Sequence, residues 1–440
     1  MRETSLYRSS GYLRSSIAFA ILAASAVVPA SAADLGGDCC ADLEERIAEL
    51  EATTARKGNR KVSLTVAGQV NKALMYWDDG VEQNTYVVGN KNDQSNFSFI
   101  GEAAIVPGWK AGYELVVRMT DNLSDAVDQD VSDAGSGFFV WQSHWFIESD
   151  KLGKFSLGLA SRATDTVPET DLSEAGVAGY AGMQDIGGGF RLRLNNGTLS
   201  DVVWGDILNH FNGDTANVIR YDTPEIAGFI ASASWGEDDI WDIALRYSGE
   251  GHGFKYEGAI GYTEVTDTTN EIFGNDNGLD NNTVLGSFSV LHVKSGLNFT
   301  FAAGHRDWIG SAADADGVDR SPPDTKFIYS KVGWIANCVP LGATAFYGEY
   351  GWFRDYLTVV NDADIVTSLD APADSRIAGD TAEVWGIGVV QHIDAAEMQV
   401  YLGYRHHTAE FDILDSGGAK VNAGDIDDFD TLIAGSKIAF

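Results

Sequence analysis

The stretch Asp425-Ile-Asp-Asp-Phe-Asp-Thr-Leu-Ile-Ala-Gly-Ser-Lys-Ile-Ala-Phe440 ends the chain and does most to decide its fold. From Leu432 onward, apolar residues recur at every second position, which indicates a β-strand with one largely apolar face. In a soluble β-sandwich, the alternative, this terminal strand would be an exposed edge that invites pairing with other chains. In a closed membrane barrel the edge disappears, and a terminal aromatic residue lies in the interfacial girdle. The stretch therefore favours the membrane barrel.

The same alternation runs through the chain from Val62 onward. Segments such as Trp241–Tyr247, Leu297–Phe301 and Val400–Arg405 alternate apolar side chains with polar ones. A soluble sheet with one wet face would also alternate. It would not explain polar and charged inner positions in strand after strand, with Trp and Tyr at the strand ends. The pattern predicts a lipid-facing wall around a wet interior.

The connections between these segments alternate between short and long. Short connections are expected at Val106–Trp109, Ser149–Gly153, Thr223–Gly228, Gly249–Gly253, Lys294–Gly296, Ala336–Leu341 and His392–Ala396. Long ones are expected at about Trp77–Ser95, Thr120–Gly137, Ser161–Asp214, Thr263–Asn281, His305–Thr325, Phe353–Thr381 and Asp412–Asp427. The exception is Gly236–Asp239, a short connection where a long one is due. The pattern predicts an all-β, transmembrane, antiparallel β-barrel of sixteen strands over residues 62–440, with tight periplasmic turns and long external loops.

The N-terminal part is expected to be a secretory signal followed by a short periplasmic segment. Residues 1–32 combine a basic start, a short apolar run and the small-residue cleavage site Ala30-Ser31-Ala32. The run is too short for a transmembrane anchor. In the segment 33–61, Asp42–Ala52 has the apolar spacing of a short α-helix. That helix could form a coiled-coil seam that registers an oligomer, or lie against the barrel rim.

The formal net charge of −34 indicates which binding partners to expect. Nucleic acid is not expected as a partner, because phosphate repels such a surface. An acidic field enriches cations near an opening that it lines, although solubility and acidic surface loops also account for acidic composition.

No metal site, cofactor or disulfide framework is expected. Cys39 and Cys40 are adjacent, and Cys338 lies far away in an apparent turn. The segments Asn275–Gly278 and Asp314–Gly317 contain fragments of calcium-loop chemistry without the later bidentate Glu, so turns are the expected reading. The adjacent residues His406 and His407 should point to opposite faces of one strand, and therefore cannot chelate together.

Four stretches of the chain resemble the general porins of the outer membrane of α-proteobacteria. They are Asp42–Lys61 running into the first strand, Glu148–Gly158, Arg220–Pro224 with Ala231–Asp238, and the end at Phe440. Their order and spacing are more specific than any one of them. The resemblance implies a homotrimer in the outer membrane of a Gram-negative bacterium, in contact with lipid and lipopolysaccharide. It also implies a third loop that folds inward and narrows the pore.

The third loop is where function is expected. It carries Asp165, Glu169, Asp171 and Glu174, and a ring of carboxylates in a narrow passage selects ions by charge. Basic residues at inward strand positions should face this loop; the candidates are Arg118, Arg220, Arg246, Lys331 and Arg405. An acidic loop facing a basic wall would create a transverse electric field, which would orient dipolar solutes as they pass. A solvated acidic loop outside the barrel, and wall ion pairs far from the constriction, are the alternatives.

The function expected from the sequence is a passive diffusion channel for ions and small hydrophilic solutes, with a preference for cations. It is not expected to be an enzyme. A membrane-embedded hydrolase would need a Ser, a His such as His144 and an acid on one wall, and no nucleophile motif is present. An adhesive or tethering barrel would have longer, repeat-like loops. The second strand, Asn96–Glu102, has no basic residue where such porins often carry one, which also favours cations.

Overall fold

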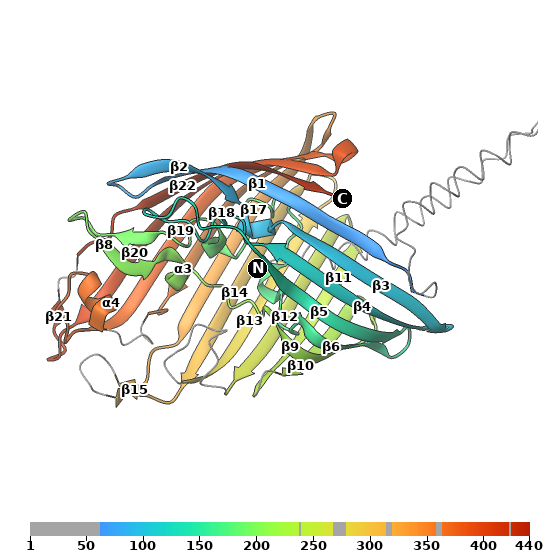
Figure 1. The fold of residues 1–440 in the computed structure, drawn as a ribbon, viewed down its shortest axis with the longest axis horizontal. Helices are drawn as coiled ribbons and strands as arrows, with labels where there is room; N and C mark the ends of the chain where they lie inside the picture. Colours follow the sequence, from blue (N-terminus) through green and yellow to red (C-terminus); the bar gives the residue numbers. More distant parts are fainter. Residues whose placement is uncertain (1–61, 237–238, 267–278, 314–318, 358–362, 422–423) are drawn as a thin grey trace, which may run out of the picture.

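A computed structural model describes residues 62–440 except 237–238, 267–278, 314–318, 358–362 and 422–423 (Figure 1). The expected signal, the N-terminal helix, Cys39, Cys40 and both calcium-like segments lie outside the described residues. No helix within the described ranges is long and apolar enough to cross a membrane.

Sixteen long strands make the wall of a closed antiparallel barrel, as the sequence predicts. In order around the wall they are β1 (Thr65–Asp78), β3 (Asn96–Val106), β4 (Trp109–Met119), β5 (Phe138–Ser149), β6 (Gly153–Ser161), β9 (Thr215–Asp222), β10 (Phe229–Gly236), β11 (Ile240–Gly251), β12 (Phe254–Val265), β13 (Asp280–His292), β14 (Leu297–Ile309), β17 (Thr325–Val339), β18 (Gly342–Arg354), β19 (Arg376–Ile393), β20 (Met398–Leu414) and β22 (Phe429–Ala439). Each pairs with the next, and β22 pairs with β1 to close the ring.

Shorter elements lie in the connections. The strands are β2 (Gln83–Gly89), β7 (Arg191–Arg193), β8 (Leu199–Val203), β15 (Ala312–Ala313), β16 (Asp319–Arg320) and β21 (Lys420–Val421). The α-helices are α3 (Trp204–Ile207) and α4 (Ala363–Ser368), and the 3-10 turns are η2 (Lys91–Asp93), η3 (Val167–Glu169), η4 (Met183–Asp185) and η6 (Asp394–Ala396).

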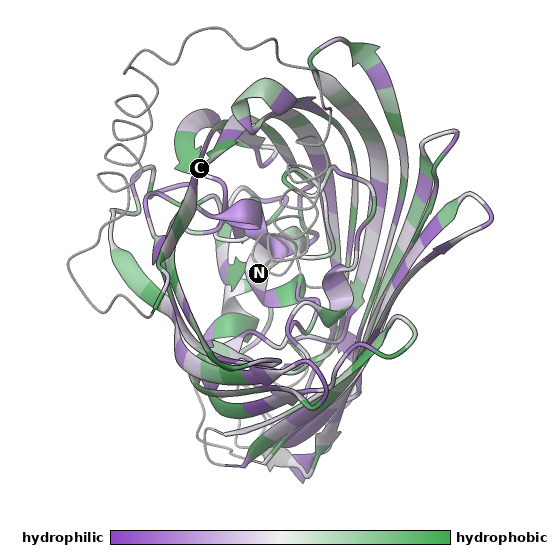
Figure 2. Ribbon diagram, turned by 90° about the vertical axis from the view of Figure 1, so that its right-hand side faces the viewer, coloured by the Kyte–Doolittle hydropathy of each residue, from purple (hydrophilic) through white to green (hydrophobic). Residues whose placement is uncertain are grey.

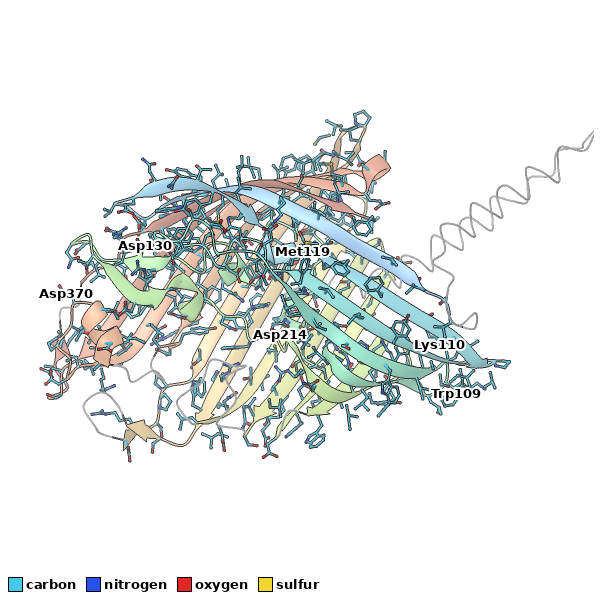
Figure 3. The ribbon with its side chains drawn as sticks, in the orientation of Figure 1. Trp109, Lys110, Met119, Asp130, Asp214 and Asp370 are labelled. Atoms are coloured by element: carbon cyan, nitrogen blue, oxygen red, sulfur yellow. The ribbon has the colours of Figure 1, made fainter. Side chains whose placement is uncertain are left out.

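Short and long connections alternate around the barrel, which confirms the prediction. Figure 3 labels Trp109 and Lys110 at the end with the short turns, and Asp130 and Asp370 at the end with the long loops. The β10–β11 connection is short at the loop end, as expected. One end of the barrel therefore carries short turns, and the other end carries long loops.

The two faces of the wall differ as a lipid-facing barrel requires. On β1, Val66 is 51% exposed and Leu74 54%, whereas Asn71, between them on the opposite face, is fully buried. Figure 2 looks into the ring of strands and shows hydrophobic and hydrophilic residues alternating along them. Further segments of the chain lie inside the ring (Figure 2). His406 and His407 follow the same rule, because His406 is partly exposed and His407 is buried.

The barrel closes where the C-terminal strand meets the first strand. Gly68 and Phe440 exchange two backbone hydrogen bonds, with N···O distances of 3.0 and 2.9 Å. A Cβ atom on Gly68 would lie 2.7 Å from Cζ of Phe440 and 2.6 Å from the carbonyl oxygen of Asn96. Glycine at position 68 therefore makes room for the terminal ring and for the neighbouring strand.

Two details differ from the sequence-based expectation. The long connection Trp77–Ser95 contains β2. This strand pairs with residues 72–78 of β1, whereas β3 pairs with residues 65–69. The chain turns inward between them because Asn90, which is buried, donates a hydrogen bond to the carbonyl of Val177 at 2.8 Å. Cys338 lies in strand β17, beside a bulge near its end, and not in the following turn.

Candidate functional site: the third loop inside the barrel

Most of the segment between β6 and β9, residues 162–214, lies inside the barrel, and its β7–β8 hairpin lies at the loop end (Figure 1). Its side chains are mostly buried, and residues such as Val167, Val177 and Met183 belong to the hydrophobic core of the molecule. Irregular backbone at membrane depth is tolerated where it is enclosed by protein or water and not by lipid. The prediction that the third loop folds inward is confirmed.

The first anchor of the loop lies on β11. Asp242 accepts hydrogen bonds from the backbone N–H groups of Ala163 and Thr164, at 3.1 and 2.9 Å. Arg246 donates to the carbonyls of Ala163 and Asp165, at 2.7 and 2.6 Å.

A neighbouring arginine fixes the point where the loop leaves β6. Arg220 donates to the carbonyls of Ser161 and Arg162, at 3.0 and 3.1 Å, and forms an ion pair with Asp222 at 2.9 Å. Charged groups on the wall thus satisfy loop backbone groups that would otherwise be buried without partners.

The second anchor is a buried ion pair between the wall and the loop. Nζ of Lys331, on β17, lies 2.7 Å from Oδ2 of Asp171 and donates to the carbonyl of Gly179 at 2.8 Å. The Lys331 side chain is fully buried. A buried charge needs such partners, because removal from water is costly unless the charge is paired and hydrogen-bonded.

The third anchor is Arg405 on β20. Its Nη1 donates to the carbonyl of Met183 at 3.0 Å, and its Nε lies 2.8 Å from Oε1 of Glu349 on β18. The hydroxyl of Tyr329 donates to the other oxygen of Glu349 at 2.9 Å. Together with Arg220 on β9, the three anchors tie the loop to the wall from β9 round to β20.

The four loop carboxylates lie in two different environments. Asp165, Glu169 and Asp171 are 1%, 2% and 8% exposed, whereas the side chain of Glu174 is 43% exposed. Asp165 accepts a hydrogen bond from Asn212 at 2.7 Å, and Glu169 pairs with a buried histidine, His210, at 2.9 Å. Of the four, only Glu174 has a largely exposed carboxylate, which lies 4.0 Å from Nε2 of His392 on β19. That the four select ions by charge stays a prediction.

The five basic wall candidates all lie on the inner face, and four of them contact the loop. Arg220, Arg246 and Arg405 bind loop carbonyls, and Lys331 binds Asp171 as well. The guanidinium of Arg118 stacks on the ring of Trp141, 3.5 Å from the ring centroid. The geometry makes the four contacting residues holders of the loop; that the five orient solutes stays a prediction.

Reasoning from the sequence did not predict that acidic residues of the wall help to hold the loop. Asp242 and Glu349 are buried, at inward positions of β11 and β18. The alternation of those strands already placed both side chains inside the barrel. What was missing is the distance to the loop, which depends on how the barrel closes.

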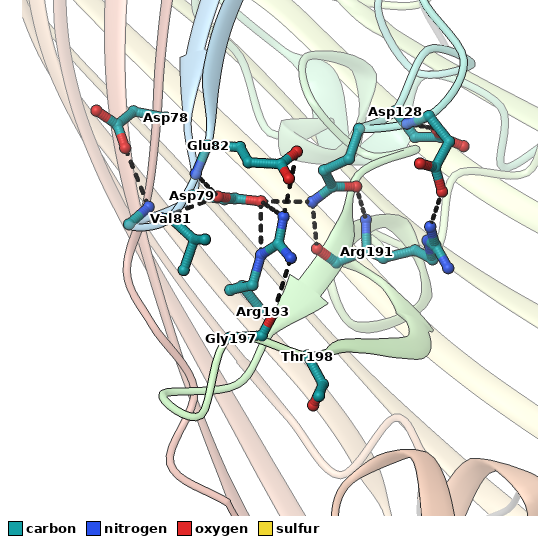
Figure 4. Close-up of polar contacts among 12 residues, drawn as sticks. Asp78, Asp79, Val81, Glu82, Asp128, Arg191, Arg193, Gly197 and Thr198 are labelled. Carbon is teal, nitrogen blue, oxygen red and sulfur yellow. Dashed lines mark hydrogen bonds and ion pairs between the residues drawn. The ribbon is translucent and has the colours of Figure 1, made fainter.

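The far part of the loop forms a clamp at the loop end of the barrel (Figure 4). Arg193, on β7, forms an ion pair with Asp79 in the β1–β2 turn at 2.8 Å. Gln129 donates to Asp79 at 3.1 Å and to the carbonyl of Arg191 at 2.8 Å. Arg191 also pairs with Asp130. Three loops are joined at this point by charged groups.

Aromatic side chains pack between the third loop and the inner wall beneath the clamp. Phe190 lies 4.9 Å from Trp77 and 5.0 Å from Phe429, ring centroid to ring centroid, and Trp204 stacks on Phe429 at 5.8 Å. Such pairs contribute about 0.5–1.5 kcal/mol each beyond the burial of their area. The loop is therefore packed against β1 and β22 as well.

The inner wall near the short turns carries partly exposed charges of both signs. Nζ of Lys110 lies 3.0 Å from Glu102 and 3.1 Å from Glu148, and all three side chains are more than a quarter exposed. His144, the candidate for a hydrolase, lies 3.8 Å from Glu114 on the same wall.

The comparisons with known proteins agree with this architecture. The family model described as Gram-negative porin matches residues 18–427. No curated protein matches the chain by sequence. The anion-selective porin from Comamonas acidovorans is similar in structure, with a TM-score of 0.53, 14% identity, and coverage of 86% of this chain and 100% of that chain. OmpT, an outer membrane protein of Vibrio cholerae, in its trimer form, has a TM-score of 0.51, 11% identity, and coverage of 86% and 99%.

Such low identities show a shared fold and no more, whereas the family match spans most of the sequence. The chain belongs to the Gram-negative porin family and forms a β-barrel channel of the outer membrane.

Proposed function

We propose that this porin is a passive diffusion channel for ions and small hydrophilic solutes, with a preference for cations. The observation that carries the proposal is a long irregular loop bound to the inner wall of a closed barrel. A loop held in this way filters solutes by size, and the charges that remain exposed filter them by sign.

The preference for cations rests on Glu174 and on the net charge of −34. The Comamonas acidovorans porin is anion-selective by its title. At 14% identity that selectivity does not transfer, and the acidic balance here favours the opposite sign.

The test is the reversal potential of single channels in a KCl gradient across a planar bilayer. Glu174→Gln should move the reversal potential towards zero, because it removes the exposed loop carboxylate. Glu410→Gln removes the same charge from the outer side of β20 and should leave the potential unchanged. Selectivity for anions in the unaltered protein would contradict the proposal.

We also propose that the chain forms a homotrimer through the outer face of β1, β2 and β22. On the outer side of β1, Lys72 lies between Val70 and Leu74, which are 49% and 54% exposed. Its ammonium group reaches across Gly89 to form an ion pair with Asp121. A Lys side chain on a lipid-facing wall is costly, by up to about 2–4 kcal/mol at the bilayer midplane and less towards the interfaces. Contact with other copies of the chain would remove that cost.

A bulky substitution tests this face. Val87, on β2, is 65% exposed, and Val332, on β17, is 60% exposed. Val87→Trp should convert trimers into monomers in detergent, measured by light scattering, whereas Val332→Trp should not. Equal masses for both variants and the unaltered protein would remove this face from consideration.

A further inference from the structure

A group of metal-binding side chain types lies on the outer wall near the long loops. His305 and Asp307 are two residues apart on β14, so both project from the same face of the strand. This is the outward face, which carries Leu297 at the other end of the strand. Asp324 directly precedes β17, whose residue Thr325 pairs with Arg306. Two neighbouring wall strands therefore bring the three side chains together.

The geometry of these side chains suits a single ion. Nε2 of His305 lies 2.7 Å from Oδ1 of Asp307 and 3.4 Å from Oδ2 of Asp324. The three ligand atoms all lie within 4.8 Å of one another. Zinc binds imidazole nitrogen and carboxylate oxygen at about 2.0–2.2 Å, so neighbouring ligand atoms around it are about 3.3 Å apart. Small side-chain adjustments on a rigid wall would reach this geometry.

The charges favour a cation at this position. Asp307 and Asp324 share one imidazole, and the only other charged group in contact with them within the described ranges is Nζ of Lys326, 3.9 Å from Asp324. All four side chains are between 42% and 56% exposed, so an ion can reach them from outside the barrel.

We propose that His305, Asp307 and Asp324 bind a divalent transition-metal cation such as zinc on the outer wall. Imidazole together with carboxylate is a ligand set that suits such ions. Three protein ligands leave at least one position open, and it faces away from the barrel, towards water or an anionic group. The proposal does not depend on the selectivity of the channel.

A second group on the same rim provides a matched control. His406 lies 2.8 Å from Asp430 through Nδ1 and 3.6 Å from Asp428 through Nε2. Its two carboxylates contact different ring nitrogens, and these three residues do not form one of the convergent groups found among the described residues. This group should behave as an ion-pair network and should not bind zinc.

Calorimetric titration of metal-stripped, untagged protein in detergent with zinc chloride tests the proposal. The unaltered protein and His406→Ala should bind one tight equivalent per chain. His305→Ala and Asp307→Asn should lose that equivalent, and Lys326→Met should bind zinc more tightly because a competing cation is removed. Cobalt should give the visible absorption of a low-symmetry site only where His305 is present.

Two results would contradict the proposed zinc site. If the unaltered protein binds no zinc, or if His305→Ala binds zinc as tightly as the unaltered protein, the proposal is wrong. A heat-dependent shift in electrophoretic mobility, measured on every variant, shows that each barrel is folded. Conductance measured in parallel separates this result from the proposed channel function.

Discussion

At the scale of single residues, the interior is held together by charged groups that need their partners. The sequence placed Lys331 and Arg405 on the inner face by alternation, but it could not show that they hold the third loop. Their burial makes them sensitive positions, since an uncompensated buried charge is among the most damaging changes to a protein.

Breaking the Lys331–Asp171 pair should destabilise the protein strongly. Asp171→Asn removes the carboxylate that pairs with the buried ammonium group of Lys331, and should lower the free energy of unfolding by about 3 kcal/mol. Adding Lys331→Met in the same chain should recover much of this loss. The measurement is urea unfolding in lipid or detergent. Lys420→Met breaks an exposed pair with Asp412 and should change stability by less than about 1 kcal/mol. Equal effects at both sites would contradict the assignment.

Gly68 should not tolerate a side chain. Gly68→Ala pushes against the terminal ring and the carbonyl of Asn96, so folding yield should fall, as measured by the heat-dependent mobility shift. A Cβ on Gly348, also in a wall strand, would meet its nearest atoms at 3.9 Å. Gly348→Ala should therefore fold normally. A normal yield for Gly68→Ala would mean that the seam between β22 and β1 is less tightly packed than described.

At the scale of elements, the third loop combines an inner part anchored on the wall with an outer hairpin, β7–β8, clamped by Asp79. Burial opposes ionisation of Asp79. Hydrogen bonds from the backbone N–H of Glu82 and from Arg193 outweigh it, and the pKa of Asp79 lies below its ordinary value of 3.8. The clamp is therefore fully formed above about pH 3.8, and is lost as the pH falls through the lowered pKa.

This clamp predicts a pH effect on the channel. Asp79→Asn should increase the current noise of single channels at neutral pH, because the β7–β8 hairpin is released. The unaltered channel should be equally quiet at pH 5 and pH 8, and should become noisy only below about pH 3.8. Asp130→Asn removes an exposed partner of Arg191 and should have little effect. Noise that rises between pH 8 and pH 5 would point to a different titrating group.

At the scale of the whole molecule, the outer and inner faces of the wall have different chemical character. The outer face presents large apolar residues over most strands, and the inner face holds polar groups and the third loop. A molecule of this kind has its apolar surface outside, so it depends on lipid or detergent for solubility.

Transfer into detergent should therefore decide whether the protein folds. Refolding from urea into detergent micelles should give the circular dichroism of a β-sheet, together with a folded band that shifts on boiling. The same refolding into buffer alone should give aggregates. A soluble, folded monomer in buffer would contradict the membrane barrel.

The sequence by itself determined the local periodicity: which segments are strands, which face of each meets lipid, and that short and long connections alternate. These properties depend on residues close together in the chain, and a period of two is readable without any distant contact. Only the tertiary structure decided what the third loop touches, why Asp171 is buried while Glu174 is exposed, and that β2 and β3 pair with different halves of β1. These depend on how sixteen strands curve into a ring, which brings residues more than a hundred positions apart into contact.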